Sequence, residues 1–287
     1  MKVLVTGKNG QLGSEIRAIE NEFEQFNFLF TDSKELNISN KSEVDSFFSN
    51  NTINAVINCA AYTAVDKAEE EHEKANSVNH LGIKHIADMC KKHSCKLIHI
   101  STDYVFDGES LSPYKEVDSV NPKSEYGKTK LAGEKAVLDV ESLAAVIVRT
   151  SWVYSGHGTN FVKTMLRLAK DHKVLKVVDD QIGSPTFAKD LAKVCLDILN
   201  TPCWSKQTEI YHYSNEGSCS WCEFAEKILE FKSSNCKVLP ISTKEYPTLA
   251  PRPSFSVFNK SKIKDHFNIE INTWQESLKQ HLSNKNV

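Results

Sequence analysis

The first residues of the chain carry the pattern that most restricts its fold. Residues 2–6 form a short apolar strand, and a glycine-rich turn then leads into a helical pattern that includes Ile16 and Ile19. A strand, a glycine turn and a helix in this order bring backbone N–H groups and the positive end of a helix to a pyrophosphate. The sequence therefore predicts a dinucleotide-binding turn. Gly7, Gly10 and Gly13 permit this turn and a close approach of its backbone to the phosphates.

Apolar strands and helices continue to alternate along the chain up to residue 199. The strand expected at 55–60 hardly alternates between apolar and polar residues, as is typical of a strand buried on both faces. The alternation predicts an α/β fold with a Rossmann-like, doubly wound parallel sheet. Past residue 205 it loosens, so we expect a smaller α/β substrate-binding lobe at the carboxyl edge of the sheet.

These patterns also suggest a division of the chain into two parts. Residues 1–151 are expected to form the dinucleotide-binding domain, to which residues 177–204 return. Residues 152–176 and 205–287 are expected to form the substrate-binding lobe.

Composition narrows the class of protein. The 287 residues are 40% hydrophobic and 25% charged, with a formal net charge of -2, so no electrostatic argument favours a nucleic acid or a membrane surface as partner.

The N-terminus enters a strand directly and does not resemble a signal peptide, so we expect a cytoplasmic protein with reduced cysteines. Cys219 and Cys222 have C-x-x-C spacing, but Ser220 and Glu223 also fit a helix capping box, which we favour over metal or redox chemistry.

Three further segments should lie near the expected dinucleotide. Asp32 follows the second strand, about 20 residues after the glycine turn, where an acid can bind the adenosine ribose. Asp32 favours NADH, whereas the neighbouring Lys34 could hold the 2′-phosphate of NADPH, so both cofactors stay open. Asn37 and Ile38 would lie under the adenine if the next helix starts near Asn40. The small residues around Ala61, Tyr62 and Thr63 would let the backbone pass close to a dinucleotide.

Candidate catalytic residues follow the fourth strand and begin a later helix. The strand expected at 96–100 leads into Thr102, Asp103 and Tyr104, and ligands bind beyond the carboxyl ends of such strands. Tyr126 and Lys130 are four residues apart, which places them on one face of a helix. A phenol beside an ammonium can donate a proton with a tunable pKa, although the pair alone would also fit a solvated helix face.

Taken together, these motifs resemble a known family. The glycine turn, Ser101-Thr102 and Tyr126-x-x-x-Lys130 are similar to those of extended short-chain dehydrogenases/reductases. Longer blocks at 60–69, 101–108, 126–134 and 149–154 resemble dTDP-4-dehydrorhamnose reductases, and Asp180-Gln181-x-Gly183-Ser184-Pro185-Thr186 and Arg252-Pro253 extend the resemblance into the second lobe. It covers nearly the whole chain.

The resemblance implies a reaction and a role for each matching residue. A reductase of this family transfers a hydride from NADPH or NADH to the C4 keto group of dTDP-4-dehydro-6-deoxy-L-mannose, giving dTDP-L-rhamnose for polysaccharide synthesis. Tyr126 would donate the proton, Lys130 would lower its pKa and bind the nicotinamide ribose, and Thr102 would bind the same sugar oxygen. Tyr104 would tune the site, and Trp152 would pack on the sugar.

Substrate affinity, metal and assembly are separate expectations. Arg252 lies between Pro251 and Pro253, which stiffen the loop, so we expect its guanidinium to bind the diphosphate of the substrate. Asp103 and Trp152 are also expected to bind the substrate. The resemblance adds Gln11 and Leu12 to the residues that would line the cofactor. Some relatives bind magnesium at a dimer interface. Glu15 matches one such ligand position, but no metal-site residues are assigned, and a homodimer stays an open expectation.

Two rival functions remain. One is a reductase or epimerase of another nucleotide sugar. The other is a non-catalytic regulatory subunit with the same fold, as occurs in the superfamily. The retention of Thr102, Tyr126 and Lys130 argues against a regulator, which would not need all three.

Overall fold

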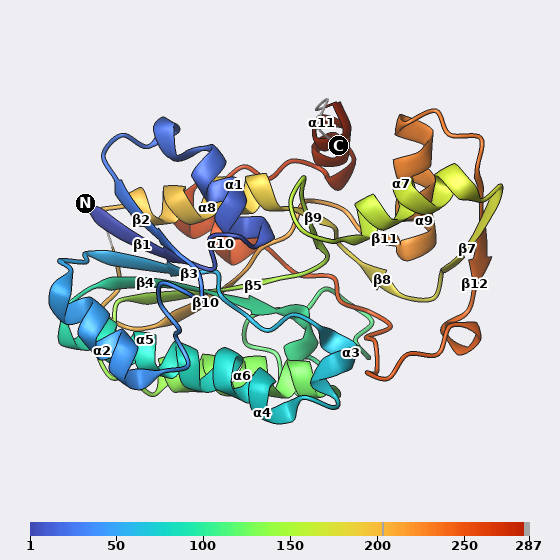
Figure 1. Ribbon diagram of the computed structural model, residues 1–287. Coiled ribbons are helices and arrows are strands. Elements are labelled where there is room, and N and C mark those ends of the chain that lie inside the picture. The colour runs from blue at the N-terminus through green and yellow to red at the C-terminus, as the bar shows by residue number, and fades with distance from the viewer. Residues whose placement is uncertain (203, 284–287) are drawn as a thin grey trace.

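The computed structural model describes residues 1–202 and 204–283. Its centre is a parallel sheet of six strands in the order β10-β5-β4-β3-β1-β2 (Figure 1). The strands are β1 (Lys2–Thr6), β2 (Asn27–Thr31), β3 (Ala55–Asn58), β4 (Lys96–Thr102), β5 (Ala145–Thr150) and β10 (Glu209–His212). All five neighbouring pairs are parallel, which confirms the predicted Rossmann-like sheet.

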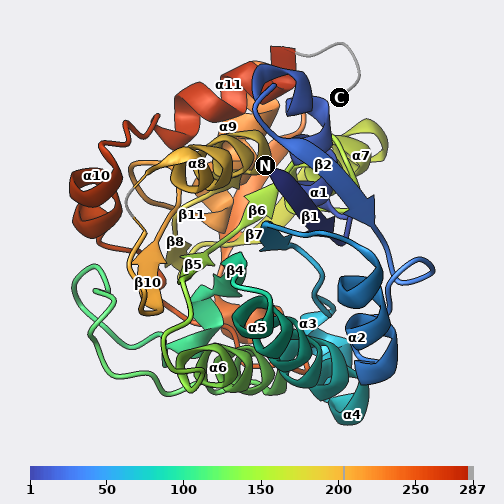
Figure 2. The same ribbon diagram turned by 90° about the vertical axis from the view of Figure 1, so that its left-hand side faces the viewer.

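Helices cover both faces of this sheet, as the end-on view in Figure 2 shows. On one face a core that includes Ile16 and Leu196 packs against the strands, and on the other face a core that includes Phe48 and Ile86 does the same. The first layer contains α1 (Gln11–Ala18), α8 (Ala188–Asn200) and α10 (Ser261–Phe267), and the second contains α2 (Lys41–Asn50), α5 (Ile83–Lys92) and α6 (Glu125–Leu138). Both faces are therefore apolar, which explains the lack of alternation in β3.

The direction of winding reverses between β1 and β3. The chain runs from β1 to β2 on one side and then returns to place β3 on the other side of β1. Ligands of open α/β sheets bind where the strand order reverses, beyond the carboxyl ends. The glycine turn after β1 and the segment after β3 meet at this point.

A second lobe extends from the centre to the right of Figure 1 and is built around its own core, which includes Leu175, Phe224 and Leu278. Its members are β6 (Val153–Tyr154), α7 (Phe161–Asp171), β7 (Val174–Val178), β8 (Ile182–Gly183), β9 (Thr186–Phe187), β11 (Cys219–Ser220), α9 (Trp221–Phe231), β12 (Lys237–Ile241) and α11 (Trp274–Ser283).

The boundary between the lobes differs from the division expected from the sequence. Strand β10 was expected in the second lobe, but it pairs with β5 in the main sheet, and Ile263 of α10 packs in the same core. Conversely, β7 pairs with β12 in the second lobe, so the return to the first lobe begins with α8 and not at residue 177. Short apolar strands do not reveal which sheet they join, because partner choice depends on contacts distant in sequence.

Several local expectations are confirmed. Helix α2 begins after Asn40, whose side chain caps it, and α9 begins with the capping box of Ser220 and Glu223. The helical region after residue 65 is interrupted as expected: α3 (Val65–Ala68) and α4 (His72–Asn76) are separate, and a π-helical turn, Ser77–Gly82, joins α4 to α5. Within the described part of the chain, no helix has the length and apolar character that crossing a bilayer requires.

Candidate active site

The glycine turn is as tight as a dinucleotide motif requires. Gly7 has a φ of 69°, and a Cβ on it would lie 2.7 Å from the backbone nitrogen of Ala60. A Cβ on Gly13 would lie 2.4 Å from the Gly7 carbonyl oxygen. Gly10 donates its N–H to that same oxygen at 2.9 Å and is the N-cap of α1. The first N–H groups of α1, which have no acceptor within the helix, are thus presented at the switch point of the sheet.

The side chains of the next two residues have other tasks. Leu12 is buried in the core between α1 and the sheet. Gln11 reaches the second lobe: its Nε2 donates to the Val153 carbonyl at 3.2 Å, and its Oε1 accepts from Asn160 at 2.9 Å. Only the backbone of these two residues is therefore placed to contact a phosphate, and Gln11 links the two lobes.

Asp32 stands directly after β2, beside the turn. Its carboxylate accepts from the Lys34 N–H at 2.8 Å and from the Asn9 side chain at 2.7 Å. The Lys34 N–H is the main reason why the pKa of Asp32 is lowered. The carboxylate is held where the ribose of a bound dinucleotide would run.

Asp32 gives a first prediction, on coenzyme preference. Replacing Asp32 with Ala removes the ribose acceptor and also the charge that repels a 2′-phosphate. We expect the kcat/KM ratio of NADPH to NADH to rise about tenfold, the size of one hydrogen bond. Steady-state kinetics with both coenzymes measure this ratio, and Lys34→Ala should shift it the opposite way. An unchanged ratio in Asp32→Ala would contradict the assignment.

Asn37 and Ile38, which were expected to lie under the adenine, have different surroundings. Asn37 is exposed, and its side chain accepts from the Ser39 N–H at 3.1 Å. The side chain of Ile38 is buried in the core under α2 and α5, so it faces the sheet. Ile38 could contact a dinucleotide only through its backbone, and its carbonyl already accepts from His85.

The segment of Ala61, Tyr62 and Thr63 is fixed by a residue that sequence reasoning missed. The Asn79 side chain accepts from the Tyr62 N–H at 2.8 Å and donates to the Tyr62 carbonyl at 3.0 Å. It also donates to Thr129 of α6 at 3.2 Å. Asn79 is buried in the π-helical turn. It therefore ties the expected cofactor-lining segment to the helix that carries Tyr126.

Helix α6 is packed so that Tyr126 faces the end of β4. Ser124 caps the helix by accepting the Gly127 N–H at 3.1 Å. A Cβ on Gly127 would lie 2.2 Å from the Tyr104 carbonyl oxygen, so only glycine permits this approach. The Tyr126 ring meets the Tyr104 ring edge-on with centroids 5.5 Å apart. The three expected residues Thr102, Tyr104 and Tyr126 are thus brought together.

Electrostatics keep Tyr126 in its protonated form. Burial raises the pKa of Tyr126 far above that of a free phenol, and the nearby charge of Asp103 raises the pKa further, while a hydrogen bond with Thr102 opposes both. Burial also raises the pKa of Asp103 to about 6. Asp103 accepts from the Thr102 hydroxyl at 2.9 Å. A buried phenol that stays protonated at neutral pH is suited to donate a proton.

Lys130 lies on the same face of α6, but its ammonium is engaged elsewhere. Its Nζ donates to the Ile100 carbonyl at 2.6 Å, and burial lowers the pKa of Lys130 to about 8. The group that lowers the pKa of Tyr126 here is Thr102. The role of Lys130 in lowering the pKa of Tyr126 therefore stays a prediction.

Polar residues buried beneath the site were also missed by sequence reasoning. Thr6, at the end of β1, donates to Asn58 at 2.7 Å, and Asn58 lies 3.1 Å from Nδ1 of His99. Burial, with a smaller contribution from the Lys130 charge, lowers the pKa of His99. These side chains connect three neighbouring strands, and no local pattern predicts such contacts because they form only across the sheet.

Trp152 marks the entry to the second lobe. Its φ of 49° is rare for a residue other than glycine, and its indole stacks on Trp221 with centroids 3.5 Å apart. A Cβ on Gly183 would lie 2.5 Å from the Trp152 ring, so that glycine makes room for it. Trp152 is half-buried. One face of the indole is therefore taken by protein, and a sugar contact would use the remaining surface.

Arg252 lies beside Tyr104. It donates to the Tyr104 hydroxyl at 3.3 Å and to Asp66 at 2.5 Å. With Ser124, Tyr104 and Pro253 it lines a small hollow. The expected substrate-binding arginine is thus placed next to Tyr104 and not at a remote position.

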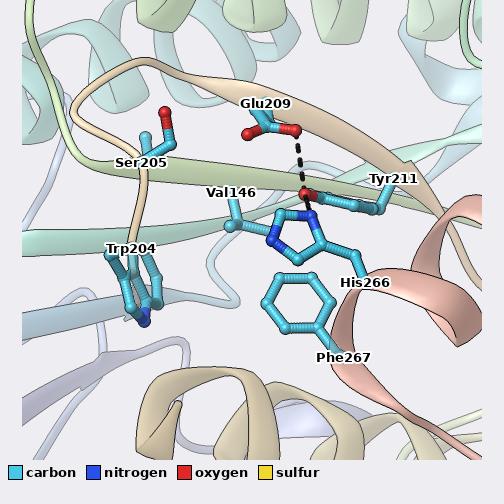
Figure 3. A pocket seen from close by; sticks show the side chains of 8 residues that line it. Val146, Trp204, Ser205, Glu209, Tyr211, His266 and Phe267 are labelled. Atoms are coloured by element: carbon cyan, nitrogen blue, oxygen red, sulfur yellow. Dashed lines mark hydrogen bonds between the residues drawn. The ribbon is translucent and has the colours of Figure 1, made fainter. Parts of the chain in front are cut away.

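A second small hollow lies at the opposite end of the sheet (Figure 3). There Tyr211 donates to Glu209 at 2.9 Å and lies 2.5 Å from Nδ1 of His266. Val146 and Glu209 stand at the amino ends of β5 and β10, whereas ligands of such sheets bind at the carboxyl ends. We therefore place the candidate active site at Tyr126.

Glu15 is buried in α1, and burial raises its pKa. Among residues 1–202 and 204–283, no group of three or more His, Cys, Asp or Glu side chains is arranged to hold a metal ion.

Comparison with known proteins identifies the family. The family model described as the RmlD substrate binding domain matches residues 1–287. The dTDP-4-dehydrorhamnose reductase of Aggregatibacter actinomycetemcomitans is 41% identical, with 97% of each chain covered. The chain belongs to the dTDP-4-dehydrorhamnose reductase family.

Solved structures of the dTDP-4-dehydrorhamnose reductase family agree with the fold. The enzyme from Clostridium acetobutylicum is 42% identical, with a TM-score of 0.93 and 99% of both chains covered. The enzyme from Bacillus anthracis, solved in complex with NADP, is 39% identical, with a TM-score of 0.93 and 98% of both chains covered. The Rossmann-like architecture expected from the first residues is therefore that of the family.

Proposed function

We propose that this protein reduces the C4 keto group of dTDP-4-dehydro-6-deoxy-L-mannose with NADPH or NADH, giving dTDP-L-rhamnose. Membership of the reductase family supports this reaction, and the bound NADP of the Bacillus anthracis relative supports the cofactor. The observation that carries the proposal is the meeting of Thr102, Tyr104 and Tyr126 at the carboxyl end of β4, beside a tight glycine turn.

Each residue of the site would have a separate role in the reduction. The nicotinamide cofactor, when bound, supplies the hydride. The backbone N–H groups at the start of α1 would hold its pyrophosphate, Asp32 its ribose, and Tyr62 would line its path. Tyr126 holds its proton at the phenol oxygen until charge develops on the C4 oxygen, and Thr102 orients that phenol. Trp152 and Arg252 would bind the parts of the substrate that do not react.

A direct assay tests the reaction. Purified protein is mixed with NADPH or NADH and a panel of nucleotide-linked 4-keto sugars, and the nicotinamide absorbance is followed. We expect oxidation of the cofactor with the dTDP-linked 4-keto-6-deoxy-L-sugar. Activity with another nucleotide sugar only would favour the rival reductase or epimerase, and no activity with any sugar would favour the regulatory subunit.

Arg252 gives a prediction on substrate affinity. Its planar fork can bind a diphosphate through two parallel hydrogen bonds, which a lysine cannot imitate. We expect Arg252→Lys to raise KM for the sugar nucleotide by about 10- to 150-fold, equivalent to 1.5–3 kcal/mol for a bond to a charged group. KM for NADPH should change by less than about twofold. Equal KM values for the sugar nucleotide would assign the diphosphate to another residue.

The proposal also includes the cellular compartment and the oligomeric state of the protein. We propose the cytoplasm as the compartment, since both the nicotinamide cofactor and sugar nucleotides are supplied there. A homodimer is proposed from the family resemblance alone. Light scattering on the purified protein measures its molar mass and distinguishes a monomer from a dimer.

A further inference from the structure

A short strap of the second lobe, residues 250–255, crosses to the first lobe and is held at both ends. At its far end, the Phe255 N–H and the Ser254 hydroxyl both donate to the Gly108 carbonyl, at 3.0 and 2.7 Å. Gly108 has a φ of 79°, and a Cβ there would lie 2.5 Å from Pro253. The strap is therefore seated closely on the loop that follows β4 and Tyr104.

At its near end the strap is held by one carboxylate, Asp66 in the first turn of α3. The Asp66 Oδ1 accepts from the Ala250 N–H at 3.1 Å, and its Oδ2 accepts from Arg252 Nη2 at 2.5 Å. Pro251, between these two residues, has no N–H to offer. Asp66 thus takes both available donors on this side of the strap. It also lies only three residues after Thr63, at the end of the segment expected to line the cofactor.

The Asp66 contact orients the guanidinium of Arg252 but occupies only part of its N–H donors. A guanidinium has five N–H donors in a fixed plane. One points to Asp66 and one to the Tyr104 hydroxyl, at 2.5 and 3.3 Å, which leaves donors for a further anion. The Arg252 side chain keeps 19% of its surface exposed. An anionic ligand can therefore bind Arg252 while Asp66 and Tyr104 hold it in place.

We propose that Asp66 is a positioning residue of this site, which fixes the strap and orients the Arg252 guanidinium beside Tyr104 for the phosphates of the sugar nucleotide. The inference rests on the proposed function, since it assigns a support to the substrate-binding arginine. If Asp66 only stabilised the loop, its effect on substrate affinity would not depend on Arg252. As a positioning residue, Asp66 affects substrate affinity only when Arg252 is present.

A double-mutant cycle separates these two roles. In Asp66→Asn the side chain keeps its shape but turns an NH2 group toward either the Ala250 N–H or the guanidinium, both of which are donors. We expect KM for the sugar nucleotide to rise about tenfold, with less than about twofold change in the Kd of NADPH. In an Arg252→Met background the same Asp66→Asn change should alter that KM by less than about twofold.

A matched control comes from α2. Asp45 pairs with Lys41 and has 42% of its side chain exposed, against 43% for Asp66, but it lies far from the strap in sequence and fold. Asp45→Asn should leave KM for the sugar nucleotide and the Kd of NADPH unchanged. An unaltered KM in Asp66→Asn, or equal effects of Asp66→Asn with and without Arg252, would overturn the positioning role.

A measurement without turnover keeps this test separate from that of the function. In Asp66→Ala, hydrogen exchange of the Ala250 amide should accelerate at least about tenfold, while exchange in β1 and α6 stays as in the wild type. Unchanged exchange at Ala250 would show that Asp66 does not hold the strap. If the wild-type protein reduces none of the sugars, the proposed function fails, and this exchange result still decides whether the contact exists.

Discussion

Tyr126→Phe should lose about 10²–10⁴-fold in kcat, because general acid catalysis by a positioned side chain is typically worth that much. The change removes one hydroxyl and leaves the ring against Tyr104. Since burial raises the pKa of Tyr126, the phenol is protonated at neutral pH and ready to donate. Cofactor affinity should stay within about threefold of the wild type. Steady-state kinetics and fluorescence titration with NADPH measure the two quantities.

A matched control for this variant is Tyr211→Phe, in the hollow of Figure 3. Tyr211 also bonds through its hydroxyl, to Glu209 and His266, but it lies at the amino ends of the strands. Loss of the Tyr211 hydroxyl should lower the free energy of unfolding by about 1 kcal/mol and leave kcat unchanged. If Tyr126→Phe kept more than half of the wild-type kcat, Tyr126 would not be the proton donor.

Gly10→Val should abolish tight binding of the dinucleotide while the protein still folds. A Cβ on Gly10 would lie 3.3 Å from the Gly7 oxygen, a distance that small shifts relieve, whereas one on Gly13 would lie 2.4 Å from that oxygen and would disrupt the turn itself. The branched side chain of Val would stand where the pyrophosphate approaches the backbone. Loss of two hydrogen bonds from backbone N–H groups to the charged pyrophosphate predicts that the dinucleotide binds on the order of 100-fold more weakly.

Fluorescence titration with NADPH measures this loss, and circular dichroism checks the fold. Gly156→Val is a suitable control, since a Cβ on Gly156 meets nothing within 4 Å. The control should bind NADPH as the wild type does. Wild-type affinity in Gly10→Val would mean that the turn holds no dinucleotide.

Local sequence patterns predicted five of the six strands of the main sheet and the position of the glycine turn. Gly7 and Gly13 are required because a Cβ on either would lie within 3 Å of backbone atoms, so the place of the turn after β1 could be predicted. The same holds for Tyr126 and Lys130, because the period of a helix alone puts them on one face. The capping box at Ser220 likewise depends only on residues that are close in sequence.

Contacts between residues far apart in the chain could be known only from the folded protein. No pattern around Asp66 shows that it meets Arg252, 186 positions later, or that Asn79 ties Tyr62 to Thr129. The placement of β10 in the main sheet and of β7 in the second lobe also depends on distant partners. The environment of Lys130 is decided in the same way, since its ammonium is held by a carbonyl of β4. The turns, the helix faces and the candidate chemistry could be predicted because they follow from neighbouring residues. Packing determined which charges pair and which tyrosine is buried, because those energies arise only when segments distant in the chain are folded together.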